Sequence, residues 1–148
     1  MTETLPASRS IVVERTVPHP PEKVWRALTE SALIGDWLMQ NDLRPVVGHR
    51  FNFRATPIPN AWNGVSDCEV LVVEPCRRLA WRQQASGDQK ADGLDTVVTW
   101  TLTPTDGGTH VRMEQSGFRP QDEQGFQMMG GGWPRILGGL ERVAGELA

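Results

Sequence analysis

A chain of 148 residues can hold one domain with a substantial core and is too short for two ordinary ones. Its net charge of −3 and pI near 5.6 argue against nucleic acid as the main partner, because phosphate binding needs a basic face. No apolar stretch resembles a signal peptide or a membrane span, so we expect a cytoplasmic protein. Its two cysteines, Cys68 and Cys76, are then expected as free thiols. Residues 1–9 read as a flexible tail and residues 10–148 as a single domain.

The first part of that domain predicts one strand and two short helices. Ser10 to Val17 is rich in β-branched residues and predicts a strand. The prolines that follow end it, and Pro20 or Pro21 lies where a helix can start, which we expect over Glu22 to Thr29. A second helix is expected over Ser31 to Trp37, with Ser31 as its N-cap.

The middle of the chain predicts five antiparallel strands, because apolar and polar residues alternate there with a period of two. Two polar loops, residues 55–64 and 85–93, interrupt the alternation and contain little that could be buried. The expected strands are Gly48 to Arg54, Val65 to Glu74, Leu79 to Gln84, Leu94 to Thr103 and Thr109 to Phe118.

The last stretch, Phe126 to Leu147, predicts a long helix with one apolar side. It is a poor helix former, because each interior glycine costs about 1 kcal/mol relative to alanine and Pro134 costs roughly 3 kcal/mol. Contacts with the rest of the chain must therefore stabilise it, and its missing side chains leave room beside it. We expect Ile136 to Leu147 to anchor the helix and Met129 to Trp133 to border a pocket.

The resulting order, β-α-α-β-β-β-β-β-α, indicates an α+β fold. Five stretches of the chain form recognisable motifs: Pro21 to Trp37, Gly48 to Phe53, Glu74 to Trp81, Ser116 to Phe118 and Gly132 to Leu137. With these motifs the chain resembles the activator of Hsp90 ATPase homologue 1-like (AHSA1-like) family of the START/Bet v 1-like (SRPBCC) superfamily. The resemblance implies a helix-grip fold, in which a curved antiparallel sheet surrounds a long C-terminal helix. Gln115 stands where many relatives have histidine.

Large apolar side chains gather at positions expected to face the space between sheet and closing helix. They predict either a solid core or a cavity for a small apolar molecule, such as a lipid, an aromatic or a polyketide-like compound. Trp62 lies instead in a Pro- and Asn-rich loop, as a lid over the pocket mouth or a clamp for the loop. The candidate ligand-binding residues are Trp37, Phe51, Phe53, Trp62, Trp81, Trp100, Met113, Phe118, Met129, Trp133 and Leu137.

Two other functions stay open at this point. An enzyme of the polyketide cyclase/aromatase type would need an acid or base in the cavity, for which Asp67, Glu69 and His49 are the candidates. A chaperone- or self-interaction module would expose an apolar patch, in a monomer or a homodimer. No metal or cofactor is expected, because the three histidines are scattered. We expect the remaining strand charges to form ion pairs on the outer face of the sheet: Arg54, Arg82, Arg112, Glu69 and Glu114.

Overall fold

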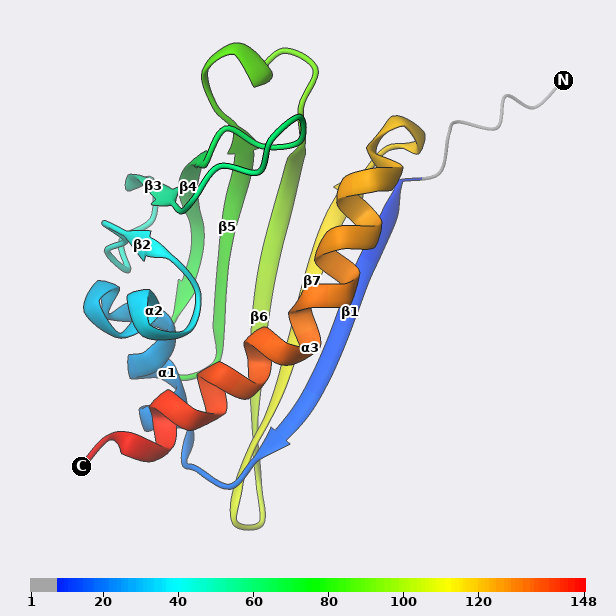
Figure 1. Cartoon of the computed structure of the whole chain (residues 1–148). Coiled ribbons are helices and arrows are strands. Elements are labelled where there is room, and N and C mark those ends of the chain that lie inside the picture. Colours follow the sequence, from blue (N-terminus) through cyan, green and yellow to red (C-terminus); the bar gives the residue numbers. More distant parts are fainter. Residues whose placement is uncertain (1–7) are drawn as a thin grey trace, which may run out of the picture.

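The computed structural model describes residues 8–148, and its body is one seven-stranded antiparallel sheet with the order β1-β7-β6-β5-β4-β3-β2 (Figure 1). Alternate side chains of each strand enter the core, as the period of two predicted. Of the predicted tail, Arg9 already belongs to the first strand, and residues 1–7 lie outside the described part. The strands are β1 (Arg9–Val17), β2 (Gln40–Asn41), β3 (Arg50–Arg54), β4 (Val65–Glu74), β5 (Arg78–Ala85), β6 (Asp95–Thr105) and β7 (Gly108–Phe118).

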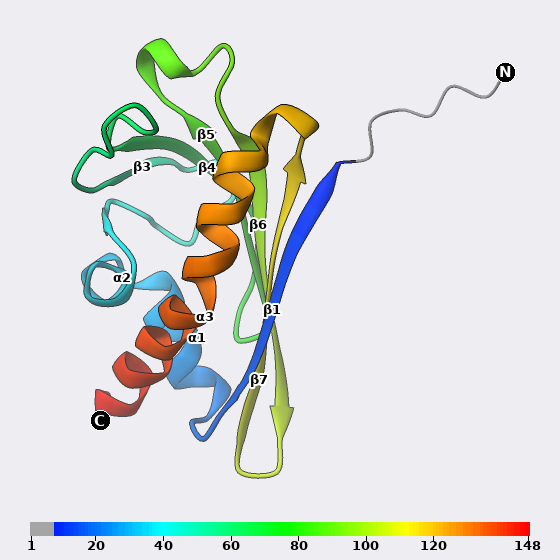
Figure 2. The same ribbon diagram turned by 45° about the vertical axis from the view of Figure 1, so that its right-hand side comes forward.

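All three α-helices lie on the same, concave face of the sheet (Figure 2). They are α1 (Pro21–Thr29), α2 (Ser31–Trp37) and α3 (Glu123–Glu146), and two 3-10 turns, η1 (Gly87–Gln89) and η2 (Pro120–Asp122), lie in the loops. A curved antiparallel sheet with a long C-terminal helix confirms the predicted α+β helix-grip fold.

Helix α3 changes direction near Pro134, which has no N–H to continue the helical hydrogen bonds (Figure 1). Its first half runs alongside β7 and β1, and its second half crosses to pack on α1 and α2. The buried stripe along it contains Trp133, Leu137, Leu140 and Val143. The packing of this stripe compensates for the low helix propensity of the glycines.

Some local predictions were wrong. The two-residue strand β2 was missed, because two polar residues give no periodic pattern. Glu30, not Ser31, occupies the N-cap of α2, and no side chain caps the helix there. The strand expected from Gly48 begins at Arg50, because Gly48 adopts a positive φ of 88° within the preceding turn.

Both cysteines are free thiols, as predicted. Cys68 pairs with Gln83 across β4 and β5, while Cys76 lies in the turn between those strands. A register shift between Val70 and Val72 moves this pairing by one residue from the one that a regular hairpin would give. Burial raises the pKa of the Cys68 thiol, which keeps it protonated at neutral pH.

Candidate functional site

The centre of the concave face is a cluster of tryptophan rings around Trp100. Its ring centroid lies 5.6 Å from that of Trp37, 6.3 Å from that of Trp81 and 5.8 Å from that of Trp133. These rings come from α2, β5 and α3, so the cluster joins the sheet to two helices. The contacts with Trp37 and Trp133 are edge-to-face, the geometry that aromatic pairs prefer.

The cluster continues toward β3 through Phe53 and Phe51. Phe53 lies 5.4 Å from Trp81 and 5.3 Å from Phe51, measured between ring centroids. Most of the predicted ligand-binding residues are therefore brought together, and in this structure their rings pack against one another. Nine of the eleven are buried, namely Trp37, Phe51, Phe53, Trp81, Trp100, Met113, Phe118, Trp133 and Leu137, whereas Met129 and Trp62 are half-buried.

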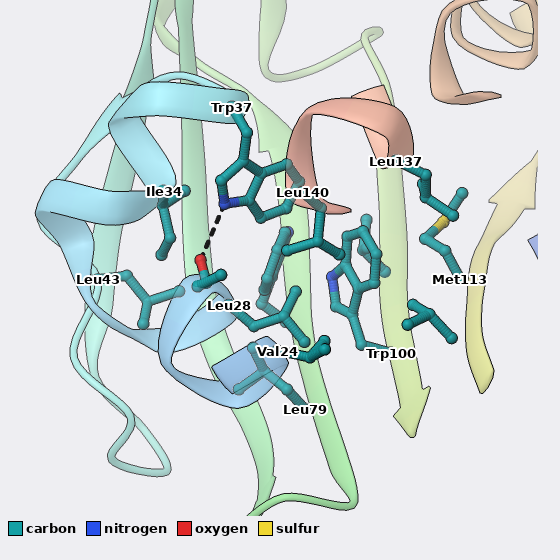
Figure 3. Close-up of a cluster of buried hydrophobic side chains, with 14 of the residues drawn as sticks. Val24, Leu28, Ile34, Trp37, Leu43, Leu79, Trp100, Met113, Leu137 and Leu140 are labelled. Atoms are coloured by element: carbon teal, nitrogen blue, oxygen red, sulfur yellow. Dashed lines mark hydrogen bonds between the residues drawn. The ribbon is translucent and has the colours of Figure 1, made fainter. Parts of the chain in front are cut away.

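The indole nitrogens of these tryptophans differ in their hydrogen bonding. Trp37 Nε1 donates to the carbonyl of Ala27 at 2.8 Å, and Trp81 Nε1 donates to Gln83 at 3.0 Å. Trp100 is fully buried, and its Nε1 has no hydrogen-bond partner among residues 8–148. Figure 3 shows this nitrogen among buried apolar side chains, with no dashed line reaching it. An unpaired buried N–H costs about 1–3 kcal/mol, so it is an exception that calls for an explanation.

A fully buried glutamine lies next to this cluster. Gln115 on β7 accepts a hydrogen bond from Trp133 Nε1 at 2.8 Å and donates one to Thr96 Oγ1 at 3.0 Å. Thr96 on β6 is in turn paired with Gln83 on β5. We call these three side chains, Gln83, Thr96 and Gln115, the polar row.

Sequence reasoning did not identify the polar row as part of the site. Gln115 was noted only because it stands where many relatives have histidine, and Gln83 and Thr96 were not proposed as site residues. One signal was present in the sequence: Gln83 lies two residues from Trp81, and Thr96 lies two residues from Val98. Residues two apart on a strand share a face, so these polar side chains had to point into the core.

Three loops meet at the end of the sheet where α3 begins (Figure 1). Gln89 of η1 accepts a hydrogen bond from the backbone N–H of Asn63 at 3.0 Å, and Asn63 Nδ2 donates to the carbonyl of Ser86 at 2.8 Å. Trp62 Nε1 donates to the carbonyl of Val65 at 3.1 Å, which holds the ring to the start of β4. This bond favours the clamp over the lid for Trp62.

Arg119 joins the loop that precedes α3 to the loop between β5 and β6. Its guanidinium donates to the carbonyls of Asp92 and Gly93 at 3.1 and 2.9 Å and to both carboxylate oxygens of Asp122 at 2.9 Å. Asp122 is buried, and these bonds from Arg119 lower its pKa below the usual range. The start of α3 is thereby fastened to the loop between β5 and β6.

The three candidate catalytic groups do not lie in the interior, which corrects the prediction that they could serve chemistry there. Asp67 and Glu69 point to the outer face of the sheet, where they lie 3.5 Å from Lys90 and 4.0 Å from Arg50. His49 Nε2 contacts a backbone carbonyl of the preceding loop at 2.9 Å. Alternation along β4 explains this result, because Cys68 between the two acids points inward.

The outer face is polar, and Arg82 forms the predicted kind of cross-strand ion pair with Asp95 at 2.7 Å. Arg112 instead pairs with Glu114 of its own strand at 2.8 Å. Arg82 lowers the pKa of Asp95 through these hydrogen bonds. Two surface pockets of about 320 and 280 Å³ lie on this side and at the β2 edge. The larger one is lined by Arg50, Phe51, Asn52, Asp67, Cys68, Glu69, Arg82, Gln84 and Lys90.

The glycines of α3 serve two purposes. A Cβ at Gly139 would lie 3.2 Å from Trp37 Cβ, and one at Gly145 would lie 2.8 Å from His19 Nε2. These two glycines therefore permit close packing of α3 on its neighbours. A Cβ at Gly138 would meet no atom within 4 Å. The prediction that missing side chains leave room beside α3 thus fits Gly138 and does not fit the other two.

Within residues 8–148, no three His, Cys, Asp or Glu side chains come together as a metal site would require. No helix in this part of the chain is long and apolar enough to cross a membrane.

Comparisons with known proteins agree with this architecture. The model of the family described as "Activator of Hsp90 ATPase homolog 1-like protein" matches residues 18–145. Protein MLL2253 of Mesorhizobium loti is 49% identical, with a TM-score of 0.85 over 95% of this chain and 99% of that one. DynU16, described as a putative protein in the dynemicin biosynthetic locus, is 25% identical, with a TM-score of 0.73 over 93% of this chain and 47% of that one.

The Aha1 dimer from Colwellia psychrerythraea is 22% identical, with a TM-score of 0.73 over 90% of this chain and 93% of that one, and it shows the fold alone. No curated protein matches the chain in sequence.

Proposed function

The chain belongs to the Activator of Hsp90 ATPase homolog 1-like family, and from that premise we propose that it binds a small, mostly apolar molecule between the sheet and α3. The bound molecule lies among the rings of Trp81, Trp100 and Trp133, with Met113 and Met129 adapting to its shape. A cytoplasmic location is part of the proposal and is supported by the two free cysteines.

The unpaired N–H of Trp100 carries this proposal. Among the described residues this buried donor has no acceptor, which costs about 1–3 kcal/mol in the free protein. A ligand with a carbonyl or hydroxyl oxygen supplies that acceptor, so the indole donor is used only in the complex.

Ligand entry requires the packed interior to open, and the loop end is the place where this costs least. The loops there are joined by side-chain bonds of Asn63, Gln89 and Arg119 rather than by a continuous strand ladder. The opposite end is closed by buried apolar contacts among α1, α2 and α3. Hydrogen bonds of exposed loops break more readily than a packed core opens.

The first test is thermal melting with a panel of lipids, aromatics and polyketide-like compounds. A ligand at one hundred times its Kd stabilises the folded state by about 2.7 kcal/mol, which raises the melting temperature by several degrees. A panel without any shift contradicts the proposal.

Two matched variants then connect binding with the indole N–H. Trp100→Phe keeps a ring and removes the unpaired donor, so the affinity for the ligand should fall. The smaller ring also leaves a cavity in the packed cluster, so the free protein should lose some stability as well. Trp133→Phe instead removes the donor to Gln115, so the free protein should lose about 1–3 kcal/mol of unfolding free energy. If Trp100→Phe binds the ligand as tightly as the wild type, the proposed role of this N–H is wrong.

An enzyme acting in the interior would need an acid or base there. The candidates Asp67 and Glu69 point to the outer face instead, which weakens this alternative. The likeness to DynU16 supports a relation to natural-product biosynthesis at the level of fold and family. Ligand binding without catalysis therefore remains the function that the described residues support best.

A further inference from the structure

The polar row divides the concave face into two chemically different parts. Gln83, Thr96 and Gln115 lie on the adjacent strands β5, β6 and β7, toward the ends where these strands meet the loops. On the other side of the row, the same inward positions carry Trp81, Val98 and Met113. The interior is thus apolar at depth and becomes hydrogen-bonding near the loop end.

The polar row has unused hydrogen-bonding capacity. A glutamine amide offers two N–H groups and two lone pairs. Gln115 uses one N–H toward Thr96 and one lone pair toward Trp133, which leaves one of each. Each polar atom of the Gln115 amide therefore has one partner, and the remaining N–H and lone pair are suited to an oxygen-bearing ligand that both donates and accepts.

The interior has no free charge to offer. Among the buried side chains of residues 8–148, the ionisable ones are Cys68 and Asp122. Burial raises the pKa of the Cys68 thiol, so this group stays neutral. Asp122 is already bonded to Arg119. An ionised ligand group next to the polar row would therefore lose its water without gaining an opposite charge.

From these observations, and resting on the proposed function, we propose that the ligand is an uncharged amphiphile with a hydroxyl or carbonyl at one end. That end lies against the polar row, and the apolar body extends toward Trp100. Carboxylate ligands, free fatty acids among them, are excluded because the polar row contains no cation to receive them.

The test compares three probes of nearly equal size by calorimetry: naphthalene, 1-naphthol and 1-naphthoate. 1-Naphthol should bind about tenfold more tightly than naphthalene, which corresponds to one added hydrogen bond in a buried site. 1-Naphthoate should bind at least tenfold more weakly than 1-naphthol. If 1-naphthoate binds as well as 1-naphthol, or naphthalene does, the inference about the polar row is overturned while the proposed function stands. If none of the three binds, and the panel of apolar compounds gives no melting shift, the proposed function fails instead.

Variants then assign the preference to the polar row. Gln115→Leu and Thr96→Val should each reduce the preference for 1-naphthol over naphthalene by about tenfold. Thr99→Val is the matched control, because Thr99 lies on the same strand with its side chain on the opposite face. If Gln115→Leu fails to fold, Thr96→Val decides the matter. An unchanged preference in a folded Thr96→Val protein contradicts the inference.

Discussion

The two ends of the concave face are built differently. At the end where α1, α2 and the second half of α3 meet, Leu28, Ile34, Leu140 and Val143 are buried among other apolar groups, and Gly139 lets α3 approach Trp37 closely. At the loop end, buried polar side chains face inward and hydrogen bonds join three loops. The apolar contacts of the first end contribute mainly to stability, and we expect the inward polar side chains of the loop end to contribute to recognition. We therefore expect mutations of buried apolar groups at the first end to reduce stability most, and mutations of the inward polar side chains at the second end to change ligand binding most.

The largest effect is expected for Leu140→Ala at the apolar end. It should reduce the unfolding free energy by about 2–5 kcal/mol, because Leu140 is fully buried and a cavity would remain. Urea denaturation measures this loss. Leu71→Ala, at an exposed position of β4, is the control and should cost no more than about 0.5 kcal/mol. Equal losses in both variants would contradict the distinction between the two ends.

The next effect concerns Asp122, which fastens the start of α3. Asp122→Asn weakens the charge-assisted bonds from Arg119 and should cost roughly 1.5–3 kcal/mol at neutral pH. Because the folded-state pKa of Asp122 is lowered, its contribution is complete above about pH 4 and is lost as the pH falls through the folded pKa. Denaturation curves of wild type and variant should therefore converge in acid. A difference independent of pH would exclude the carboxylate as its source.

Neighbouring glycines provide a third comparison. Gly139→Leu should destabilise by about 1–3 kcal/mol through overpacking against Trp37. Gly138→Leu should keep or raise stability, because a Cβ there meets open space and leucine favours helix. The melting temperatures of the two variants check this order. If Gly138→Leu is the more damaging change, the packing of α3 differs from the one described.

A smaller loss of stability than for Gly139→Leu is expected for Gln89→Ala, which removes the bonds of the Gln89 side chain to the Asn63 loop. The loss should be about 0.5–1.5 kcal/mol, since the bonds are partly exposed. Association of 1-naphthol should become faster in stopped-flow measurements, because the loops open more often. Gln121→Ala, at an exposed position of η2, is the control. An unchanged association rate would place the entrance elsewhere.

The sequence was sufficient for the fold because the fold follows from periodicity. Alternation along Val65 to Glu74 predicted β4 to the residue, and the apolar stripe around Leu137 predicted α3. Short polar elements such as β2 carry no period and were missed. The start of α3 was placed three residues late, because Glu123 to Gly125 read as a link.

The candidate site was only half predictable. Large rings such as Trp81 and Trp133 signal burial by their size, so their convergence was expected. Whether Gln115 forms its hydrogen bonds and whether the N–H of Trp100 finds a partner depend on the relative positions of separate strands and a helix to within tenths of an ångström. Sequence patterns fix which face a residue occupies and do not fix which partner it finds.

The most direct test of ligand binding in the interior uses the indole N–H signals of the six tryptophans in a ¹H–¹⁵N spectrum. On addition of 1-naphthol, the signals of Trp100 and Trp133 should move most, because one gains an acceptor and the other is bonded to the polar row. The signal of Trp25, on α1, should stay in place. If Trp25 or Trp62 moves while Trp100 and Trp133 remain fixed, the ligand binds outside the interior and the central claim is wrong.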